Sequence, residues 1–442
     1  MAAQNVLVIT VDSLRTDTYR TAVDGDGAPN VAALSRNASE FRQVIANGPN
    51  TPSSFPSILT GTHPLMHGGY RYLDETRPFL SSTLRDSGYS TIGYHSNPHL
   101  GPEKNYNHGF DVFNDGEEDR DDANTLINFV DENLSSDSRL YSLLRRLWHV
   151  FGAATGASAY ERAESITDDA LDWLADWNGE QFFMWIHYMD VHYPFQPPDE
   201  YLEAIGQEPL SARRVANLND AMEESPESLT ERDVEDLKAL YRGELHYVDH
   251  NVGRVLDALT EQGARDETMI VLTADHGEAF GEHGRWGHHP YMYDELLRVP
   301  LIVDEPGREP GTNDTQVSLI DLFPTICDAC GVERPDGLQG ENLFEKESGV
   351  ELATSAGGQR LAARTPEWKC LWHVVEDETE LYNLESDPRE TRDVSDEHPD
   401  VVDQFNGALR DYREAARSTD TDLPEVEESE AVKQRLRDLG YK

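Results

Sequence analysis

Three apolar runs in this sequence end on aspartate or histidine, residue types that bind divalent metals. The runs and the polar residues that follow them are Asn5–Val11 with Asp12, Phe182–Tyr188 with Asp190 and His192, and Met269–Ala274 with Asp275 and His276. Each aspartate alone could simply start a loop and cap the next helix. Two carboxylates, an imidazole and a hydroxyl together form a ligand set that suits Zn²⁺ or Mn²⁺. The pattern therefore indicates a metal site that several strand ends share.

A candidate nucleophile for such a site is Thr51, in the segment NTPSSFPSILTG over residues 50–61. Its prolines fit the first turn of a helix, Ser53 and Ser54 could cap that turn, and Gly61 could end the helix. Thr51 would then lie at a helix N-terminus, where free N–H groups and the helix dipole favour a phosphate or sulfate group. A threonine before a short core helix is the plainer interpretation. A metal ion that lowers the pKa of the hydroxyl favours the nucleophile.

The elements that must position these residues are buried strands that alternate with helices. The expected strands are 5–11, 90–94, 182–188, 269–274 and 299–303, and the expected helices are 28–39, 163–177, 233–262 and 319–329. This alternation predicts an α/β fold with a large, mostly parallel sheet. Ligands gather at the carboxyl ends of the strands in such sheets, and Asp12 and Asp275 would lie there.

The sequence predicts a catalytic α/β domain over 1–340, followed by two smaller parts. Short strand-like pieces predict a small sheet with a helix at 400–416 packed on it, in an α+β subdomain over 341–418. An acidic linker and a terminal helix would occupy 419–442. Two insertions are expected in the catalytic domain. They are 114–156, with helices at 126–132 and 140–151, and 201–232, a polar and irregular surface insertion or lid.

Acidic side chains far outnumber basic ones, with 84 Asp and Glu against 37 Lys and Arg and a formal net charge of −47. Such a surface would repel nucleic acid and anionic membranes. Because salt screens repulsion within an acidic chain, we predict that the source is an extreme halophile, a haloarchaeon. No apolar run approaches the roughly 20 residues of a membrane span, and we find no signal peptide. We therefore expect a cytoplasmic protein.

Four side chains with reactive potential are expected to be buried and structural. Cys327, Cys330 and Cys370 are too few for a disulfide framework. The first two have C-x-x-C spacing, which can bind metal or act in redox chemistry, but no second pair exists. They follow an apolar helical pattern, so we expect core thiols. His187 lies within an apolar strand and is expected to be a satisfied core histidine.

Motifs along nearly the whole chain resemble the sulfatase branch of the alkaline phosphatase superfamily. In the family's order they are NVLVITVDSLRTD, TPSSFPSILTG, HPLMHG, GYSTIGYHSNPHLG, GFDVF, HYMDVHYPF, TADHGEAFGEHGRWGH, RVPLIV, SLIDLFPTI and ELYNLESDPRET. One such motif would be weak support, whereas the whole series in order is strong support. The resemblance implies an alkaline-phosphatase-like three-layer sandwich and a hydrolase of sulfate or phosphate esters.

Several positions depart from the sulfatase pattern. Sulfatases carry Cys or Ser in C/S-x-P-S-R and oxidise it to formylglycine. This chain has Thr51 there, with Ser53 and Phe55 in place of the Pro and the Arg. His288 stands where sulfatases have Lys, and Asn97 stands near another usual Lys. Where sulfatases have an Asp pair after the first strand, this chain has Asp12 and Ser13. The T-x-x-S-x-P and D-H-G-E patterns are more similar to phosphoethanolamine and glycerol-phosphate transferases, whose nucleophile is Thr.

By that resemblance, one divalent ion would be held by four ligands: Asp12, Thr51, Asp275 and His276. The resemblance and the donor types favour Zn²⁺ or Mn²⁺, and they leave Ca²⁺ and Mg²⁺ open. A second metal could instead occupy a site formed by Asp190, His192 and His288, as in two-metal phosphoesterases.

The implied reaction starts with in-line attack of Thr51 on phosphorus or sulfur, which forms a covalent ester. Asn97, His192 and His288 would hold the non-bridging oxygens or protonate the leaving group. Arg71 could contact the substrate anion. Water, or an acceptor alcohol, would then resolve the covalent ester.

These observations predict a metal-dependent hydrolase of phosphate or sulfate esters, with a small-molecule, glycan-linked or lipid-linked anionic substrate. The first alternative is a phosphotransferase that moves a phosphate-linked headgroup to an alcohol acceptor. The second is a catalytically degenerate protein that binds sulfated or phosphorylated glycans, and the retained metal and nucleophile residues argue against it. The unmodified hydroxyl at Thr51 favours phosphorus over sulfur. The sequence does not indicate the oligomeric state.

Overall fold

The computed structural model describes residues 2–116 and 160–419, together with residues 423–424, 426, 428–429, 432–433, 435–436 and 439. Its main feature is an eight-stranded sheet with the strand order β10-β2-β9-β6-β1-β5-β3-β4. β9 runs antiparallel to both of its neighbours, and the other pairs are parallel. The strands are β1 (Asn5–Val11), β2 (Ser39–Ile45), β3 (Ser90–Tyr94), β4 (Val112–Asn114), β5 (Phe182–Tyr188), β6 (Thr268–Ala274), β9 (Leu301–Asp304) and β10 (Gly311–Ser318).

Strand β1 lies at the centre of the sheet because its side chains suit a fully buried position. All its residues are buried, and so are those of β5 and β6, which flank it. Side chains alternate between the two faces of a strand, so a strand covered on both faces needs apolar residues throughout. The register places Val11 beside Tyr188 and Ala274. The three strands therefore end level, and the polar residues that follow them leave the sheet at one edge.

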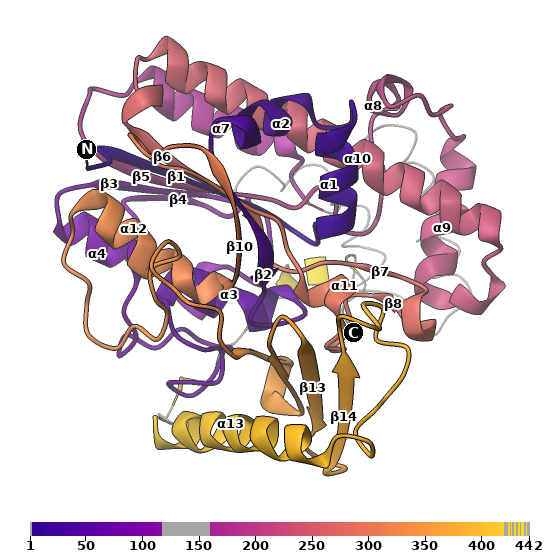
Figure 1. Ribbon diagram of the computed structural model, residues 1–442. Helices are drawn as coiled ribbons and strands as arrows, with labels where there is room; N and C mark the ends of the chain where they lie inside the picture. Colours follow the sequence, from indigo (N-terminus) through magenta and orange to yellow (C-terminus); the bar gives the residue numbers. More distant parts are fainter. Residues whose placement is uncertain are drawn as a thin grey trace.

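Helices cover both faces of the sheet and complete a three-layer sandwich (Figure 1). One layer holds α1 (Thr16–Asp24), α2 (Pro29–Arg36), α7 (Ala163–Ala175) and α10 (Glu231–Glu261). The opposite layer holds α3 (Thr51–Thr60), α4 (Leu80–Asp86) and α12 (Leu322–Cys330), the last of these after a single 3₁₀ turn, η5 (Leu319–Asp321). The predicted α/β fold with a large, mostly parallel sheet is thus confirmed.

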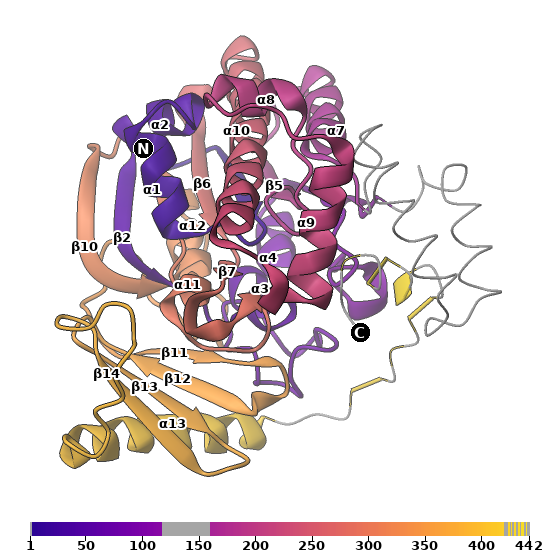
Figure 2. The same ribbon diagram turned by 90° about the vertical axis from the view of Figure 1, so that its right-hand side faces the viewer.

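The segment 201–232 differs from the irregular insertion that the sequence suggests. It contains most of α8 (Asp199–Ala204), all of α9 (Ala212–Glu224), a 3₁₀ turn, η2 (Pro226–Ser228), and the start of α10, which lie together beside the sandwich (Figure 2). Ser211 caps α9, and Thr230 caps α10 through a reciprocal capping box with Asp233. Polar caps and an amphipathic face can form helices in a stretch with few apolar residues. The acidic composition of this segment gave no clear helical pattern, so its helices were not predicted from the sequence.

A small antiparallel sheet follows the sandwich and packs against it on one face. Its strands are β11 (Glu351–Thr354), β12 (Arg360–Arg364), β13 (Trp368–His373) and β14 (Glu378–Asn383). One face, with Leu361 and Leu381, packs on the helix α13 (Pro399–Ser418), visible below the sandwich in Figure 1. The other face, with Leu371 and Tyr382, packs against Ile45 at the end of β2. Because side chains alternate between the two faces of a strand, the small sheet packs on α13 with one face and on the sandwich with the other.

Some details differ from the expectations. The helix expected at 28–39 ends at Arg36, because β2 begins at Ser39. All three cysteines are free, and Cys330 is only half-buried, unlike the other two. The helices expected at 126–132 and 140–151, and most of 419–442, lie outside the described residues. Within the described part of the chain, no helix is both long and apolar enough to cross a membrane.

Three short elements complete the described fold near the edge of the sheet. They are the hairpin strands β7 (Ala279–Phe280) and β8 (Trp286–Gly287), with the turn η4 (Glu282–Gly284) between them, and the helix α11 (Asp294–Leu297). The hairpin follows β6 directly. It therefore carries His288, the residue after β8, back to the site where Asp275 and His276 lie.

Candidate metal and nucleophile centre

Four parallel strands of the large sheet deliver buried polar side chains to one edge. Asp12 follows β1, His192 follows β5, and Asn97 follows β3. Asp275 and His276 follow β6. All of these side chains are almost completely buried. Because parallel strands end together, residues far apart in the sequence meet here without any long loop.

Helix α3 delivers Thr51 to the same place, and Thr51 is its first residue. The side-chain oxygen of Asn50 caps the helix by accepting a hydrogen bond from the Ser53 backbone N–H at 3.3 Å. The expectation that Ser53 and Ser54 cap this turn is therefore wrong. The Ser54 hydroxyl instead donates to the backbone oxygen of Asp275 at 2.6 Å. That bond ties the start of α3 to the end of β6.

Two glycines allow α3 to begin and end where it does. A Cβ atom on Gly48 would lie 2.3 Å from Ser53 Oγ, so the loop before the helix can approach its first turn only with glycine there. Gly61 ends the helix with φ of 59°, and its N–H donates to the Ser57 backbone oxygen at 3.0 Å. These local features fix Thr51 at the helix N-terminus, where the dipole favours an anion.

The hydroxyl of Thr51 lies among the side chains of three strand ends. Its Oγ1 is 3.4 Å from Asp12 Oδ2 and 3.4 Å from His276 Nε2. Asn97 Nδ2 lies 3.5 Å from the same hydroxyl and donates to Asp12 Oδ2 at 2.8 Å. The distances to Thr51 are at the long end of the hydrogen-bond range. The predicted metal, nucleophile and asparagine residues are therefore brought together.

Three of these residues fit a divalent metal ion. Asp12, Asp275 and His276 each offer a ligand atom, and these atoms lie within 4.8 Å of one another. Asp275 Oδ2 is buried and has no hydrogen-bond partner. In the described part of the chain, no lysine or arginine forms an ion pair with Asp12 or Asp275. Buried carboxylates without a cation are unfavourable, and this donor set could hold a metal ion.

The pKa values of Asp12 and Asp275 also reflect the lack of a fixed cation beside them. Burial and the neighbouring charge of Asp12 raise the pKa of Asp275 to about 8. Burial also acts against ionisation of Asp12, but His192, His187 and His276 outweigh it and hold the pKa of Asp12 well below its usual range. Burial lowers the pKa of His276 to about 4. A divalent ion would favour the charged carboxylates and the neutral imidazole together.

Two further histidines lie beside the proposed metal ligands. The rings of His192 and His288 are 4.7 Å apart between centroids, and those of His276 and His288 are 4.9 Å apart. His288 Nδ1 lies 3.3 Å from Glu278 Oε2, and this carboxylate raises the pKa of His288 against the effect of burial. His192 follows Val191, whose φ of 81° is unusual for a β-branched residue. Such strain clusters at functional sites.

Asp190 does not join a second metal site with His192 and His288. Its Oδ1 accepts a hydrogen bond from Arg162 Nε, and its Oδ2 accepts one from the Ala163 backbone N–H at 2.6 Å. Arg162 also pairs with Glu244 at 2.9 Å. Both oxygens of Asp190 are thus committed to anchoring the start of α7. Among the described residues, the group that could hold a metal is the one formed by Asp12, Asp275 and His276.

Arg71 is also not placed at the centre. It is exposed, on the loop between α3 and α4. No contact within the described residues connects it to Thr51 or to the metal ligands. A substrate contact by Arg71 stays a prediction, and it would need a ligand long enough to reach this loop.

His187 is the site residue that sequence-based reasoning missed. It was expected to be a satisfied core histidine, yet its Nε2 lies 3.4 Å from Asp12 Oδ2. Its Nδ1 lies 3.0 Å from Thr10 Oγ1, its neighbour across the β1–β5 pair. The available signal was its position as the second-last residue of β5, since a polar group there can reach the end of the adjacent strand. We assign His187 to the support of Asp12.

A cleft of about 530 Å³ opens beside this centre. Asn50, Glu278 and His288 line its inner part, and Tyr193, Trp286 and Tyr291 add aromatic surface. Its size suits a small organic substrate. The cleft therefore gives a ligand a route to His288 and the N-terminus of α3.

The comparison with known families decides the relationship of this chain. A sequence model of the sulfatase family matches residues 4–332, which is well over half of the 442 residues. The chain belongs to the sulfatase family. It is similar to a choline-sulfatase of Rhizobium meliloti, with 26% identity over 99% of this chain and 92% of that protein. It is also similar to an arylsulfatase of Clostridium perfringens, with 23% identity over 92% of this chain and 93% of that protein.

Solved structures share the fold of this sulfatase-family chain. A phosphonate monoester hydrolase from Silicibacter pomeroyi matches with a TM-score of 0.71 and 22% identity, over 92% of this chain and 95% of that one. A structure in complex with its substrate D-glucosamine-2-N,6-O-disulfate matches with a TM-score of 0.70 and 18% identity, over 95% and 99% of the two chains. The prediction of an ester hydrolase with a sulfatase-like three-layer fold is confirmed. Family members are metal-dependent.

The departures from the family pattern have visible structural roles. Phe55, at the position of the usual Arg, is fully buried and packs against the rings of Trp185 and His187. Ser13, at the position of a usual Asp, donates from its backbone to Asp275 Oδ1 at 3.2 Å and from its hydroxyl to Asp12 Oδ1 at 2.9 Å. In place of a charged residue, Phe55 therefore packs in the core, and Ser13 donates hydrogen bonds to both Asp12 and Asp275.

Proposed function

We propose that this protein is a metal-dependent hydrolase of anionic phosphate esters, with sulfate esters as the poorer substrates, and that Thr51 is its nucleophile. The observation that carries the proposal is the place of Thr51 Oγ1, at the N-terminus of α3 and 3.4 Å from both Asp12 Oδ2 and His276 Nε2. A hydroxyl buried at that point has both an anion-binding environment and a metal-ligand set around it.

Asp12, Asp275 and His276 would hold the metal ion, with the Thr51 hydroxyl as a further donor. A divalent ion bound there supplies positive charge that lowers the pKa of a hydroxyl and offsets charge on the reacting ester. The N and O donor set favours Zn²⁺ or Mn²⁺. The Ser13 hydroxyl holds Asp12 in place by its hydrogen bond, and the His187 ring lies against Asp12 with Nε2 at 3.4 Å.

The residues of this chain have the following roles in the proposed reaction. The ionised hydroxyl of Thr51 forms a bond to phosphorus while the bond from phosphorus to the alcohol oxygen breaks. Asn97 and His192 bind the non-bridging oxygens, and protonated His288, whose pKa Glu278 raises against the effect of burial, gives its proton to the departing alcohol. In the second step water forms a bond to phosphorus while the bond from phosphorus to Thr51 Oγ1 breaks. The histidine that gave its proton takes one from this water, phosphate leaves, and Thr51 is again ionised. Glu278 keeps the His288 ring oriented through the 3.3 Å contact to Nδ1.

The preference for phosphorus rests on the nucleophile. Formylglycine, the aldehyde that sulfatases use, comes from Cys or Ser, and position 51 carries Thr. The relatives named above include sulfatases, and a phosphonate monoester hydrolase shares the fold. Both substrate groups are tetrahedral oxyanions, so the same cleft can accept either. The difference in rate between phosphate and sulfate esters is therefore the quantity to measure.

The test compares chromogenic phosphate monoester, phosphodiester and sulfate ester substrates, with added Mn²⁺ or Zn²⁺ and after metal removal with a chelator. We expect the highest kcat/KM with a phosphate ester and loss of activity with the chelator. Thr51→Ala should lower kcat by at least about 10³-fold, and Thr51→Ser, which keeps a hydroxyl, should retain measurable turnover. Acid-quenched mass spectrometry should find a phosphoryl group on Thr51.

Each competing function has a distinct outcome in this test. Full activity of Thr51→Ala would remove the nucleophile assignment. Turnover of sulfate esters alone would reverse the preference for phosphorus. Transfer of the phosphoryl-linked group to an added alcohol in preference to water would favour the transferase. Tight binding of a sulfated glycan without turnover of any ester would favour the degenerate binding protein.

A further inference from the structure

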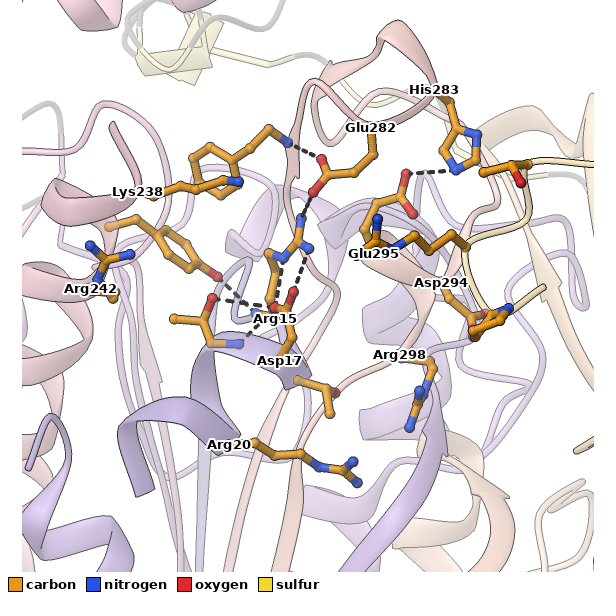
Figure 3. Close-up of a pocket in the computed structure, with 17 residues that line it drawn as sticks. Arg15, Asp17, Arg20, Lys238, Arg242, Glu282, His283, Asp294, Glu295 and Arg298 are labelled. Carbon is orange, nitrogen blue, oxygen red and sulfur yellow. Dashed lines mark hydrogen bonds and ion pairs between the residues drawn. The ribbon is translucent and has the colours of Figure 1, made fainter. Parts of the chain in front are cut away.

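A second cavity, of about 880 Å³, lies apart from the catalytic cleft. It is bordered by α1, by α10, by the hairpin loop at Glu282 and His283, by α11 and by the loop 388–391 that precedes α13. Figure 3 shows Arg15 in its middle, with Lys238 and Arg242 on one side and Arg298 on the other. No residue lines both this cavity and the catalytic cleft. We call this cavity the basic pocket.

The basic pocket gathers cations that have no carboxylate partner. In the described part of the chain, none of the five forms an ion pair: Arg20, Lys238, Arg242, Arg298 and Arg389. Arg20 and Arg298 both donate to a backbone oxygen, that of Arg42, at 3.0 Å. In a chain of net charge −47, so many uncompensated cations around one cavity indicate an anionic occupant.

The acidic side chains of the basic pocket already have partners of their own. Asp17 and Glu282 pair with Arg15 at 2.7 and 3.0 Å. Asp294 pairs with Arg364 and Lys369, both at 2.9 Å, and Glu295 lies 3.6 Å from His283 Nε2. Figure 3 shows Arg15 held between Asp17 and Glu282. Six arginine and lysine side chains line the pocket against four carboxylates, and one of these carboxylates, Asp294, also pairs with Arg364 and Lys369. The pocket therefore keeps a positive charge.

Two buried polar atoms in the wall also lack partners. Thr16 Oγ1 and Arg298 Nε are buried and have no hydrogen-bond partner. Thr16 is the first residue of α1, a helix of nine residues whose first turn lines the pocket. A helix N-terminus favours an anion. An oxyanion bound there could accept hydrogen bonds from both unpartnered groups, which would otherwise be unfavourable in a buried position.

Two aromatic rings, both almost completely buried, also border the basic pocket. Tyr241 and Phe280 line the pocket, and their rings lie 5.2 Å apart between centroids in an edge-to-face arrangement. A cavity of about 880 Å³ is far larger than an inorganic oxyanion needs, and it falls in the range of sites for small organic ligands. The combination of apolar rings and several cations matches an organic molecule that carries more than one oxyanion group.

We propose that the basic pocket binds an organic phosphate or sulfate with at least two negative charges, at a site separate from the Thr51 centre. Lys238 and Arg242 lie one turn apart on α10 and bind one charged group, while Arg298 and Arg20 bind another near the start of α1. Tyr241 and Phe280 contact the organic part. The proposal does not depend on the reaction at Thr51.

The test measures binding by isothermal titration calorimetry on the full chain with Thr51→Ala, so that turnover does not interfere. The probes are adenosine 3′,5′-bisphosphate, an organic ligand with two phosphate groups, and inorganic phosphate. The pocket variant combines Lys238→Gln with Arg242→Gln. Its matched control combines Arg36→Gln with Arg417→Gln, which remove the same charge from exposed positions outside both cavities. His288→Gln alters the catalytic cleft alone. Thermal unfolding confirms that each variant is folded.

We expect the bisphosphate to bind at least tenfold more tightly than inorganic phosphate. The pocket variant should weaken bisphosphate binding at least tenfold, and the control pair and His288→Gln should change it less than twofold. Added salt should weaken binding, because the contacts are ionic. Equal loss in the pocket variant and the control pair would overturn the proposal. So would loss with His288→Gln alone, equal affinity for the two probes, or no binding by the parent protein.

Discussion

Buried carboxylates have opposite surroundings in two regions of this molecule. At the interface between the sandwich and the small sheet, Asp294 pairs with Arg364 and Lys369, and Lys369 also pairs with Glu390 at 2.7 Å. At the strand ends, Asp12 and Asp275 have hydrogen bonds and histidines around them but no fixed cation. Each of these carboxylates at the interface pairs with a lysine or arginine, whereas Asp12 and Asp275 pair with neither among the described residues.

The difference separates structural from functional carboxylates. A buried ion pair that is complete within the protein holds two elements together, and removing one partner is strongly unfavourable. At the strand ends, where Asp12 and Asp275 have no fixed cation, a bound metal would supply the positive charge. Burial holds the pKa of Asp275 at about 8, whereas Lys369 and Arg364 hold the pKa of Asp294 well below its usual range against the effect of burial.

The largest stability effect should follow from breaking the interface. Asp294→Ala leaves Lys369 and Arg364 with fewer partners and should lower the free energy of unfolding by about 3–5 kcal/mol. Chemical denaturation measures this loss. Activity per folded molecule should stay within a few-fold of the parent, because Asp294 does not contact the Thr51 centre. Arg392→Ala, which breaks the exposed pair with Glu397, is the control and should cost less than about 1 kcal/mol. Equal losses for the two variants would contradict the comparison.

Asp275→Asn should have the opposite signature. Without metal, the variant should be as stable as the parent or more stable, because an unpartnered buried carboxylate is removed. Its affinity for Mn²⁺ or Zn²⁺ should fall by at least about 10²-fold, and the rise of the melting temperature with metal should disappear. Metal titrations followed by thermal unfolding measure both effects.

Asp190→Asn is the matched control for that experiment, since Asp190 also follows a buried strand but is paired with Arg162. It should destabilise the protein without metal and leave the affinity for metal unchanged. If Asp190→Asn instead abolished metal binding, a second metal site at Asp190 would have to be considered again. The two aspartates would then not differ in the way the contacts indicate.

A smaller effect is expected for His187, which supports Asp12 without contacting the substrate. His187→Gln should weaken metal affinity by about tenfold and leave kcat within a few-fold once metal is saturating. The separation of metal affinity from kcat distinguishes support from a direct role in the reaction. His246→Gln, on α10 with Nδ1 3.0 Å from the Gly27 backbone oxygen, should not change metal affinity. A large loss of kcat at saturating metal would place His187 in the reaction itself.

The smallest effect should come from a half-exposed ion pair in the small sheet. His373 Nε2 lies 3.0 Å from Glu380 Oε1, and this bond raises the pKa of His373. The unfolded chain has a pKa of about 6.5 at this residue, so the stabilisation is fully present below that pH. It is lost as the pH rises through the raised folded pKa. Denaturation at several pH values should show a slope along which the free energy of unfolding falls by less than about 1 kcal/mol in total. His373→Gln should remove this slope. A slope that survives the substitution would assign it to another group.

Much of the centre could be predicted from the sequence. Asp12, Asp275 and His276 each follow a long apolar run, and Thr51 sits between prolines at a recognisable helix start. The role of His187 was missed, because its position near the end of β5 is the signal for it and its apolar neighbours suit the core equally well. The sequence suggests Ser53 and Ser54 as caps of α3, whereas Asn50 caps it. Several polar residues in a row can cap the same turn, so the sequence does not distinguish them.

The sequence by itself determined the elements, because local side-chain patterns decide whether a segment is a buried strand or an amphipathic helix. It also determined the family, through motifs that keep their order along the chain. Only the tertiary structure decided which charges meet. Asp190 and Asp275 both follow buried strands, yet Arg162 from the start of α7 reaches the first, and no lysine or arginine in the described residues pairs with the second. Pairing depends on distances between residues remote in sequence, which the packing of the sheet and helices sets.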